Sequence, residues 1–289
     1  MIKVNYSSPA KINLFLSIRS KRPDGYHEIV NLMQTVDICD DISISRSARS
    51  YSTLKSKDAS IPFGKRNLCI KAYDIIKQNT MLDDDDTIEI SLNKRIPLGS
   101  GLGGGSSNAA CVIKGMNEVF KLSLSVEDQR KLSSHVGSDV PFFTTGGLAI
   151  LTGRGEIVDE LPELKSPLNL VIIKPDFSVS TGEAYKWLKE TSDKQELNRE
   201  ELISHIENND LEYITDKMHN DFEPVIENKY PFIGKLKDIM LEHGCIKSQL
   251  TGSGSGLFGV CENIETAKSI AEQMSEIPHV SFAKCCKTI

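Results

Sequence analysis

The segment Pro97-Leu-Gly-Ser-Gly-Leu-Gly-Gly-Gly-Ser-Ser-Asn-Ala-Ala110 lies between a predicted strand and a predicted helix. Residues 87–93 alternate strictly between polar and apolar side chains, as a half-buried strand does. Residues 108–120 carry apolar side chains at helical spacing. Glycine lets a backbone turn tightly and approach a ligand, and the first turn of a helix offers unpaired N–H groups with positive dipole charge. The glycines at 99, 101, 103, 104 and 105 therefore predict a phosphate-binding loop.

Three familiar classes of glycine-rich segment fit these residues less well. A Walker A loop is excluded because no Gly-Lys-Ser/Thr closes the segment. The dinucleotide pattern Gly-x-Gly-x-x-Gly occurs twice, from Gly99 and from Gly254, so it is unspecific here. The first occurrence also lacks the second parallel strand of a dinucleotide fold, because residues 125–136 have the pattern of another capped helix. A flexible linker is disfavoured because a strand and a helix adjoin the segment directly.

The composition is that of a globular chain with reduced thiols. Its 289 residues are enough for two subdomains, and its net charge of −6 argues against a nucleic-acid-binding surface. The seven cysteines form no Cys-x-x-Cys pair and the six histidines have no metal-ligand spacing, so we expect neither a disulfide framework nor a zinc site. With no apolar run of membrane-spanning length and no signal-peptide core near the N-terminus, we expect a cytoplasmic protein.

Helices and antiparallel-type strands are expected in both halves of the chain, which predicts the α+β class. We expect a boundary near residues 150–165 and divide the chain into residues 1–155 and 156–289. Residues 45–60 are expected to be a loop or a hairpin end. Strands are expected at 11–18, 29–44, 87–93, 168–173, 257–261 and 280–285. Helices are expected at 67–79, 108–120, 125–136, 200–208, 211–219, 230–243 and 264–274.

Two further segments contain charged residues that can also have ordinary structural roles. Alternation in Ser8-Pro-Ala-Lys-Ile-Asn-Leu14 puts Lys11 and Asn13 on one face of a strand, which by periodicity alone is a solvent face. In Gly137-Ser-Asp-Val-Pro141, the glycine can end a helix and Asp139 can cap the next turn. The residues alone favour these structural roles.

Two more segments have the composition of turns. Pro23-Asp-Gly-Tyr-His-Glu28 fits a β-turn with an exposed tyrosine. Leu250-Thr-Gly-Ser-Gly-Ser-Gly256 precedes a predicted strand, and it fits a plain turn as well as it fits a functional loop.

Together, and in their order along the chain, the glycine-rich loop and the four other segments resemble the GHMP kinase family (galactokinase, homoserine, mevalonate and phosphomevalonate kinases). The resemblance covers residues 8–260. It implies a two-domain GHMP kinase fold, with an N-terminal ribosomal-protein-S5-like α/β domain, a C-terminal ferredoxin-like α+β domain, and the active site in the cleft between them. The pair Ser255-Gly256 departs from the family pattern of Ala or Pro followed by a larger residue, and the extra glycine predicts a more flexible loop.

The resemblance implies ATP-dependent phosphorylation of a small alcohol. Asp139 is then the general base that accepts the alcohol proton, while Lys11 keeps that carboxylate ionised and stabilises charge on the transferred group. Mg²⁺ is implied as the companion of ATP; Ser107 is a candidate ligand, and no ligand set is assigned. The residues expected to bind ATP are Lys94, Pro97, Gly99, Ser100, Gly101, Leu102, Gly103, Gly104, Gly105, Ser106 and Ser107.

Tyr26 and His27 indicate an alcohol that carries a cytidine diphosphate group. In the branch of the family that this segment resembles, the tyrosine stacks on cytosine and the histidine hydrogen-bonds its edge. Tyr185 is expected to close the stack from the other side, with Phe177 as the alternative. The expected substrate-binding residues are Asn13, Tyr26, His27, Thr181, Tyr185, Gly252, Ser253 and Gly254.

Two alternatives remain open at this point. A GHMP kinase for homoserine or mevalonate is disfavoured by the Tyr26-His27 pair, because those alcohols carry no base. A catalytically silent nucleotide-binding member is disfavoured by the presence of both Lys11 and Asp139. We expect neither nucleic acid nor a membrane as a partner, and either a monomer or a homodimer.

Overall fold

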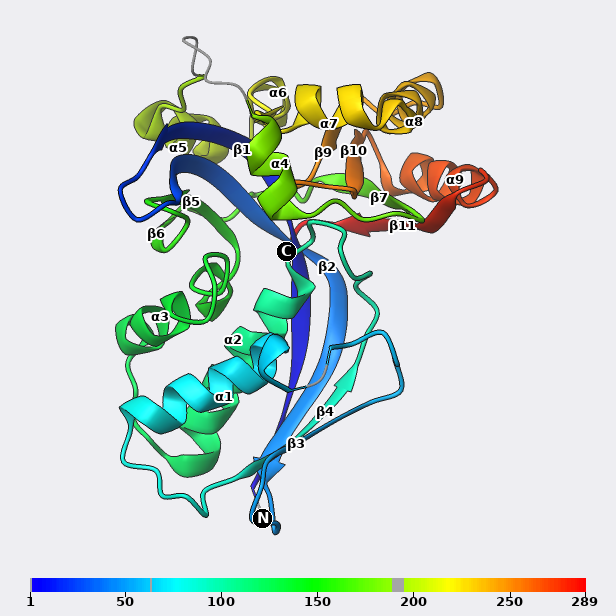
Figure 1. Cartoon of the computed structure of the whole chain (residues 1–289). Coiled ribbons are helices and arrows are strands. Elements are labelled where there is room, and N and C mark those ends of the chain that lie inside the picture. The colour runs from blue at the N-terminus through cyan, green and yellow to red at the C-terminus, as the bar shows by residue number, and fades with distance from the viewer. Residues whose placement is uncertain (1, 63, 189–194) are drawn as a thin grey trace.

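The computed structural model describes residues 2–62, 64–188 and 195–289, which fold into two packed α+β parts (Figure 1). Within these residues, seven strands form a first sheet with the order β3-β4-β2-β1-β8, and β5 joins it between β2 and β6. Its strands are β1 (Lys3–Lys21), β2 (His27–Arg46), β3 (Thr53–Ser56), β4 (Ile88–Asn93), β5 (Leu148–Thr152), β6 (Ile157–Glu160) and β8 (His219–Asn220).

The long antiparallel pair β1–β2 is the central element of the fold, and it runs from the N-terminal end up to the second sheet (Figure 1). Three helices cover one face of its lower part: α1 (Leu68–Asn79), α2 (Gly104–Phe120) and α3 (Val126–Ser134). The apolar stripe predicted for α2 is buried there against β2 and β4, with Ile44 and Ile90 fully inside. Removing such apolar surface from water is the main stabilising term of this layer.

Local signals determine where these helices begin. Asn67 caps α1 by accepting a hydrogen bond from Cys69 N at 2.9 Å. Ser125 and Asp128 form a capping box at the start of α3, where the sequence predicted a capped helix. Gly103 stands before α2 with a φ of 72°, a left-handed conformation that favours glycine. A short 3₁₀ turn at Gly64–Arg66 precedes α1, and another lies at Phe142–Thr144.

The second sheet has the strand order β11-β7-β10-β9, with every neighbouring pair antiparallel. Its strands are β7 (Asn169–Pro175), β9 (Lys247–Leu250), β10 (Leu257–Cys261) and β11 (Val280–Lys287). Between β7 and β9 the chain forms α4 (Thr181–Trp187), α5 (Arg199–Glu207), α6 (Leu211–Asp216), α7 (Glu223–Lys229) and α8 (Pro231–Glu242), and α9 (Ile264–Ser275) connects β10 to β11. This order and connectivity is the expected ferredoxin-like arrangement.

Two apolar clusters attach the second sheet to β1. Ile12, Leu14 and Phe15 pack in one cluster with Leu170 of β7 and Phe258 of β10. Leu16 and Ile18 lie in the other, which contains the residues under α8 and α9. The alternation in residues 11–18 predicts Ile12, Leu14, Leu16 and Ile18 on one face of the strand, and the structure shows otherwise. A register shift between Asn13 and Phe15 inserts one extra residue at Leu14, so the alternation changes face there.

Several element boundaries also differ from expectation. Residues 45–60 contain the strand β3, which pairs with β4, and α2 begins four residues before the expected 108. The helix expected at 211–219 ends at Asp216, because residues 219–220 form β8 parallel to β1. The sequence did not predict α7. The division between residues 155 and 156 stays a prediction; β6 begins at Ile157 and still pairs with β5 in the first sheet.

Candidate active site

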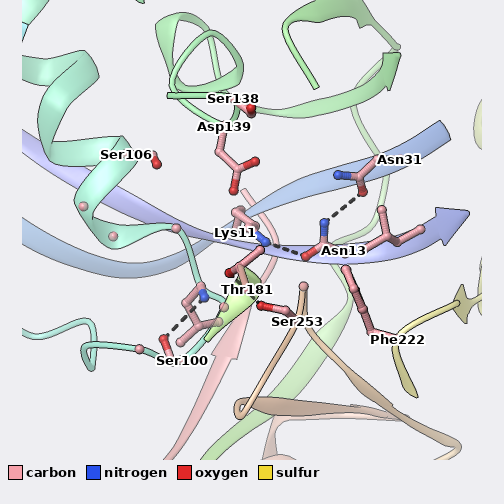
Figure 2. A pocket seen from close by; sticks show the side chains of 18 of the residues that line it. Lys11, Asn13, Asn31, Ser100, Ser106, Ser138, Asp139, Thr181, Phe222 and Ser253 are labelled. Carbon is pink, nitrogen blue, oxygen red and sulfur yellow. Dashed lines mark hydrogen bonds between the residues drawn. The ribbon is translucent and has the colours of Figure 1, made fainter. Parts of the chain in front are cut away.

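A cavity of about 550 Å³ lies where the glycine-rich loop, the middle of β1 and the second glycine loop meet. This volume is in the usual range for small-molecule sites. Figure 2 shows side chains from both parts of the fold converging on it. Of the residues singled out in the sequence, those lining the cavity are Lys11, Asn13, Tyr26, His27, Lys94, Pro97, Gly99, Ser100, Gly101, Leu102, Gly103, Gly104, Gly105, Ser106, Asp139, Thr181, Tyr185, Gly252 and Ser253.

The glycine-rich loop needs its glycines for three different reasons. Gly99 and Gly103 have φ values of 63° and 72°, in the left-handed region. Gly104 opens α2 so close to Ile96 that a Cβ would lie 2.9 Å from its Cγ2. Gly105 has no such neighbour, because a Cβ there would meet only Leu68 Cδ1 at 3.6 Å. Gly105 therefore leaves space on the cavity side of the first helical turn, where backbone N–H groups can bind an anion.

The two glycine loops touch through their backbones. A Cβ on Gly101 would lie 2.1 Å from Thr251 O, so only glycine allows this approach. Gly256 N donates a hydrogen bond to Ser100 O at 3.0 Å, and a Cβ on Gly256 would lie 2.3 Å from the same oxygen. The glycine at 256, where the sequence departs from the family pattern, thus packs directly against the first loop.

Lys11 and Asn13 lie on the cavity face of β1, and both are 2% exposed. Lys11 Nζ donates to Asn13 Oδ1, which also accepts from Thr251 Oγ1 at 3.1 Å. Asn13 Nδ2 donates to Asn31 Oδ1 on β2 at 2.8 Å. Burial lowers the pKa of the Lys11 ammonium, and the negative charge of Asp139 partly opposes that shift. The Asp139 carboxylate points toward Lys11 across the cavity (Figure 2).

Aromatic rings form the other end of the cavity. His27 stacks on Tyr185 with ring centroids 4.8 Å apart and planes at 14°. Tyr185 meets Phe222 edge to face at 4.9 Å, and burial together with the charge of Asp139 raises the pKa of Tyr185 to about 12. The ring of Tyr26, which is 49% exposed, lies under the Arg154 guanidinium at 5.0 Å.

The alternative aromatic, Phe177, lies elsewhere. It stacks on Tyr230 at 4.8 Å and packs in the apolar cluster under α8, without lining the cavity. The geometry therefore favours Tyr185 as the aromatic residue of the site.

Three predicted site residues have surroundings that the sequence did not indicate. Ser107 does not line the cavity, because its hydroxyl is buried and accepts a hydrogen bond from Ser8 Oγ at 2.7 Å. Gly254 is likewise outside the lining. Lys94 lines the cavity, but its ammonium forms a buried ion pair with Asp40. Thr181, by contrast, reaches the second glycine loop through a 2.9 Å hydrogen bond between its hydroxyl and that of Ser253.

Sequence reasoning missed four polar or aromatic lining residues, Asn31, Ser138, Arg154 and Phe222, although Ser138 stands beside Asp139 in a segment that it quoted. Asn31 is a polar residue inside the apolar run 29–44, which is a usable signal. Arg154 stands between Gly153 and Gly155 in the turn after β5, a loop position with a charge. Phe222 precedes a helix that the sequence did not predict, and nothing in its neighbourhood marks it.

No group of three or more His, Cys, Asp or Glu side chains in the described residues could hold a metal ion on its own. Asp139 is the carboxylate among the lining residues of the described chain. This donor set suits Mg²⁺, which is usually held by one or two carboxylates together with substrate phosphates and water. The helices that the structure describes are all too short or too polar to cross a membrane.

Comparison with known proteins identifies the family of the chain. The model of the GHMP kinases N terminal domain matches residues 67–147, and the GHMP kinases C terminal model matches residues 201–279. The 4-diphosphocytidyl-2-C-methyl-D-erythritol kinase of Alkaliphilus metalliredigens is 38% identical over 275 residues, which cover 95% of this chain and 94% of that protein.

Solved structures of GHMP kinases resemble the whole chain. A crystal structure of 4-(cytidine 5'-diphospho)-2C-methyl-D-erythritol kinase has a TM-score of 0.80 at 27% identity and covers 99% of both chains. A homoserine kinase from Cytophaga hutchinsonii has a TM-score of 0.74 at 17% identity over 99% of this chain and 94% of that one, a likeness of fold alone. The two-domain architecture implied by the motifs is confirmed, and the chain belongs to the GHMP kinase family.

Proposed function

We propose that this protein transfers the γ-phosphoryl group of ATP to the 2-hydroxyl of 4-diphosphocytidyl-2-C-methyl-D-erythritol, a step of non-mevalonate isoprenoid synthesis. The observation that carries the proposal is the position of Lys11 and Asp139 between the glycine-rich loop and the aromatic end of one cavity. The name of the Alkaliphilus relative supports the choice of alcohol. We expect the cytoplasm as its location.

The glycine-rich loop would hold the triphosphate. Its left-handed glycines and the first turn of α2 supply backbone N–H groups, and the open side of Gly105 leaves room for phosphate oxygens. Anion binding by N–H groups suits a chain whose net charge is −6, because no global positive field is needed. Lys94 would contribute little net charge, since Asp40 pairs with it.

Asp139 would act as the general base. As the alcohol oxygen forms its bond to the γ-phosphorus, its proton passes to the Asp139 carboxylate and the bond from the γ-phosphorus to the bridging oxygen breaks, leaving ADP. Lys11 would stabilise the negative charge on the transferred group from the opposite side. Asn13 orients Lys11 by accepting its hydrogen bond, so it is a positioning residue as well as a lining one.

The aromatic end would hold the cytidine base. Tyr26, His27 and Tyr185 offer flat faces and a ring N–H, which suit a base, while homoserine and mevalonate have no comparable group. Thr181 and Ser253, joined by their hydroxyls, would close the site over the alcohol from the second glycine loop.

Mg²⁺, when bound with ATP, would neutralise charge on the phosphates. Asp139 and the hydroxyl of Ser106, which lines the cavity, fit this ion better than Ser107, whose hydroxyl is engaged with Ser8.

The test is a coupled ADP-release assay in which the purified protein receives ATP, magnesium and one of three alcohols. We expect turnover with 4-diphosphocytidyl-2-C-methyl-D-erythritol and none with homoserine or mevalonate. Turnover with homoserine alone would reject the cytidyl alcohol. ATP binding without turnover on any of the three would instead support a silent nucleotide-binding protein.

A further inference from the structure

Asp40 is a buried carboxylate that the proposed chemistry does not use. It lies on β2, is 0% exposed, and does not line the cavity. A carboxylate is costly to bury unless charges and hydrogen-bond donors compensate it. Asp40 is compensated completely, and the groups that compensate it belong to the two ends of the glycine-rich loop.

The first end is the exit from β4. Asp40 Oδ1 accepts hydrogen bonds from Arg95 N at 2.7 Å and from Ile96 N at 2.9 Å. These two backbone groups stand immediately before Pro97, where the loop begins. The carboxylate therefore determines the direction in which the chain enters the loop.

The second end is the start of α2. Asp40 Oδ2 accepts from Asn108 Nδ2 at 2.9 Å and pairs with the Lys94 ammonium. Asn108 Nδ2 also donates to Ser8 Oγ at 2.8 Å. A Cβ on Gly104 would lie only 3.0 Å from Lys94 Nζ, so this ammonium lies against the first residue of α2.

We propose that Asp40 is the positioning residue of the ATP site: by binding residues 95–96, Lys94 and Asn108 at once, it sets the spacing between the two ends of the glycine-rich loop. The proposal deepens the proposed kinase function and rests on it for the identity of the ligand. The proposal gives Lys94 a structural role, because the Asp40 carboxylate neutralises the Lys94 ammonium.

The variant Asp40→Asn tests this. The amide keeps one acceptor for the two backbone N–H groups, but its own N–H₂ group then faces two further donors, Lys94 and Asn108. Because the variant also leaves the Lys94 cation without its partner, it is compared in a second background, Lys94→Met. In that background no unpaired lysine cation is left behind, so any loss of ATP affinity caused by Asp40→Asn is due to the loss of the carboxylate itself.

ATP affinity is measured by calorimetry with magnesium and without the alcohol, well below the melting temperature of each variant. We expect Asp40→Asn to weaken ATP binding about tenfold or more in both backgrounds and to leave the affinity for the cytidyl alcohol within about twofold. Asp41→Asn is the matched control, because this neighbouring carboxylate is half-buried and pairs with Arg95 outside the cavity. It should bind ATP as the wild type does.

Wild-type ATP affinity in the folded Asp40→Asn protein would overturn the proposal. So would an effect that disappears in the Lys94→Met background, since the orphan cation would then be its cause. If Asp40→Asn does not fold, Asn108→Ala removes one of the two connections; unchanged ATP affinity in that variant would equally reject the idea. Because ATP binding is measured without the alcohol, a failure of the proposed turnover is recognised separately.

Discussion

The rings of His27 and Tyr185 stack on each other, 4.8 Å apart at 14°, at the aromatic end of the cavity. A base that binds against Tyr185 on that side must therefore replace His27, which then becomes available to hydrogen-bond the edge of the base. Tyr185 itself is held edge to face by Phe222, so its ring keeps its orientation.

Tyr185→Ala should raise the KM for the cytidyl alcohol by about 5- to 150-fold, because stacking on a base contributes about 1–3 kcal/mol. The KM for ATP should not change, since the ring packs against His27 and Phe222. Tyr185→Phe is the matched control, keeps the flat ring, and should stay within about twofold of the wild type. Steady-state kinetics with each substrate varied in turn measures both KM values. An unchanged KM for the alcohol in Tyr185→Ala would mean that the base does not stack on this ring.

Asp139→Asn should lose about 10²–10⁴-fold in kcat, because the amide cannot accept the alcohol proton. Without magnesium, which the Asp139 carboxylate would help to hold, ATP should bind with unchanged affinity, since the substitution keeps the shape of the side chain. Calorimetry for ATP and single-turnover phosphorylation measure the two quantities. A wild-type rate would mean that another group, or none, takes the proton.

Sequence periodicity predicted the fold well where an element has one buried face and clear ends. Residues 257–261 match β10 at both ends, and the capped helix expected from residue 125 begins as α3 after its N-cap Ser125. Periodicity failed where tertiary pairing decides the structure. The extra residue at Leu14 exists because β1 pairs with β2 across a bulge, and β8 is a strand only because β1 lies beside it.

The residues of the candidate site were predicted from family motifs more than from hydrophobic periodicity or charge. Periodicity alone assigned Lys11 to a solvent face, and only its resemblance to a family motif placed it in a site; the structure buries it beneath the second part of the fold. Ser107 shows the opposite failure. A motif contains the residue but does not say that its hydroxyl turns inward to Ser8, because that direction depends on a strand about a hundred residues away.

Gly101→Ala and Gly105→Ala separate two needs for glycine. At Gly101 the φ of 78° and the nearness of Thr251 O make any side chain unfavourable, so we expect a loss of about 2 kcal/mol or more in the free energy of unfolding. Gly105 is helical and has open space, so alanine there should cost no stability. Its methyl group should nevertheless raise the KM for ATP by about tenfold, by occupying space that phosphate oxygens need. Denaturant unfolding measures the stability of each variant, and steady-state kinetics measures its KM for ATP. An unchanged KM for ATP in Gly105→Ala would mean that the phosphates do not bind beside Gly105.

Lys11→Met should reduce turnover by about 10²-fold or more, because a preorganised positive group is lost from the transition state. The same change should not destabilise the fold. Asn13 Oδ1 keeps the hydrogen bond from Thr251, and a buried ammonium is replaced by an apolar chain of similar length.

The pH dependence of the free energy of unfolding tests whether burying the Lys11 ammonium costs stability. Burial lowers the folded-state pKa of Lys11 below its usual value, so the folded state holds this proton more weakly than the unfolded state. The contribution of this group to the free energy of unfolding is therefore lowest at pH values below the folded pKa, and it rises as the pH increases through the folded pKa toward the unfolded one. Lys11→Met removes that penalty, so its free energy of unfolding at pH 7 should equal or exceed that of the wild type, and the difference should shrink as the pH approaches about 10. Denaturant unfolding from pH 7 to 10 follows the difference. A variant that is less stable than the wild type at pH 7 would mean that the Lys11 ammonium stabilises this strand, against the direction that its burial implies.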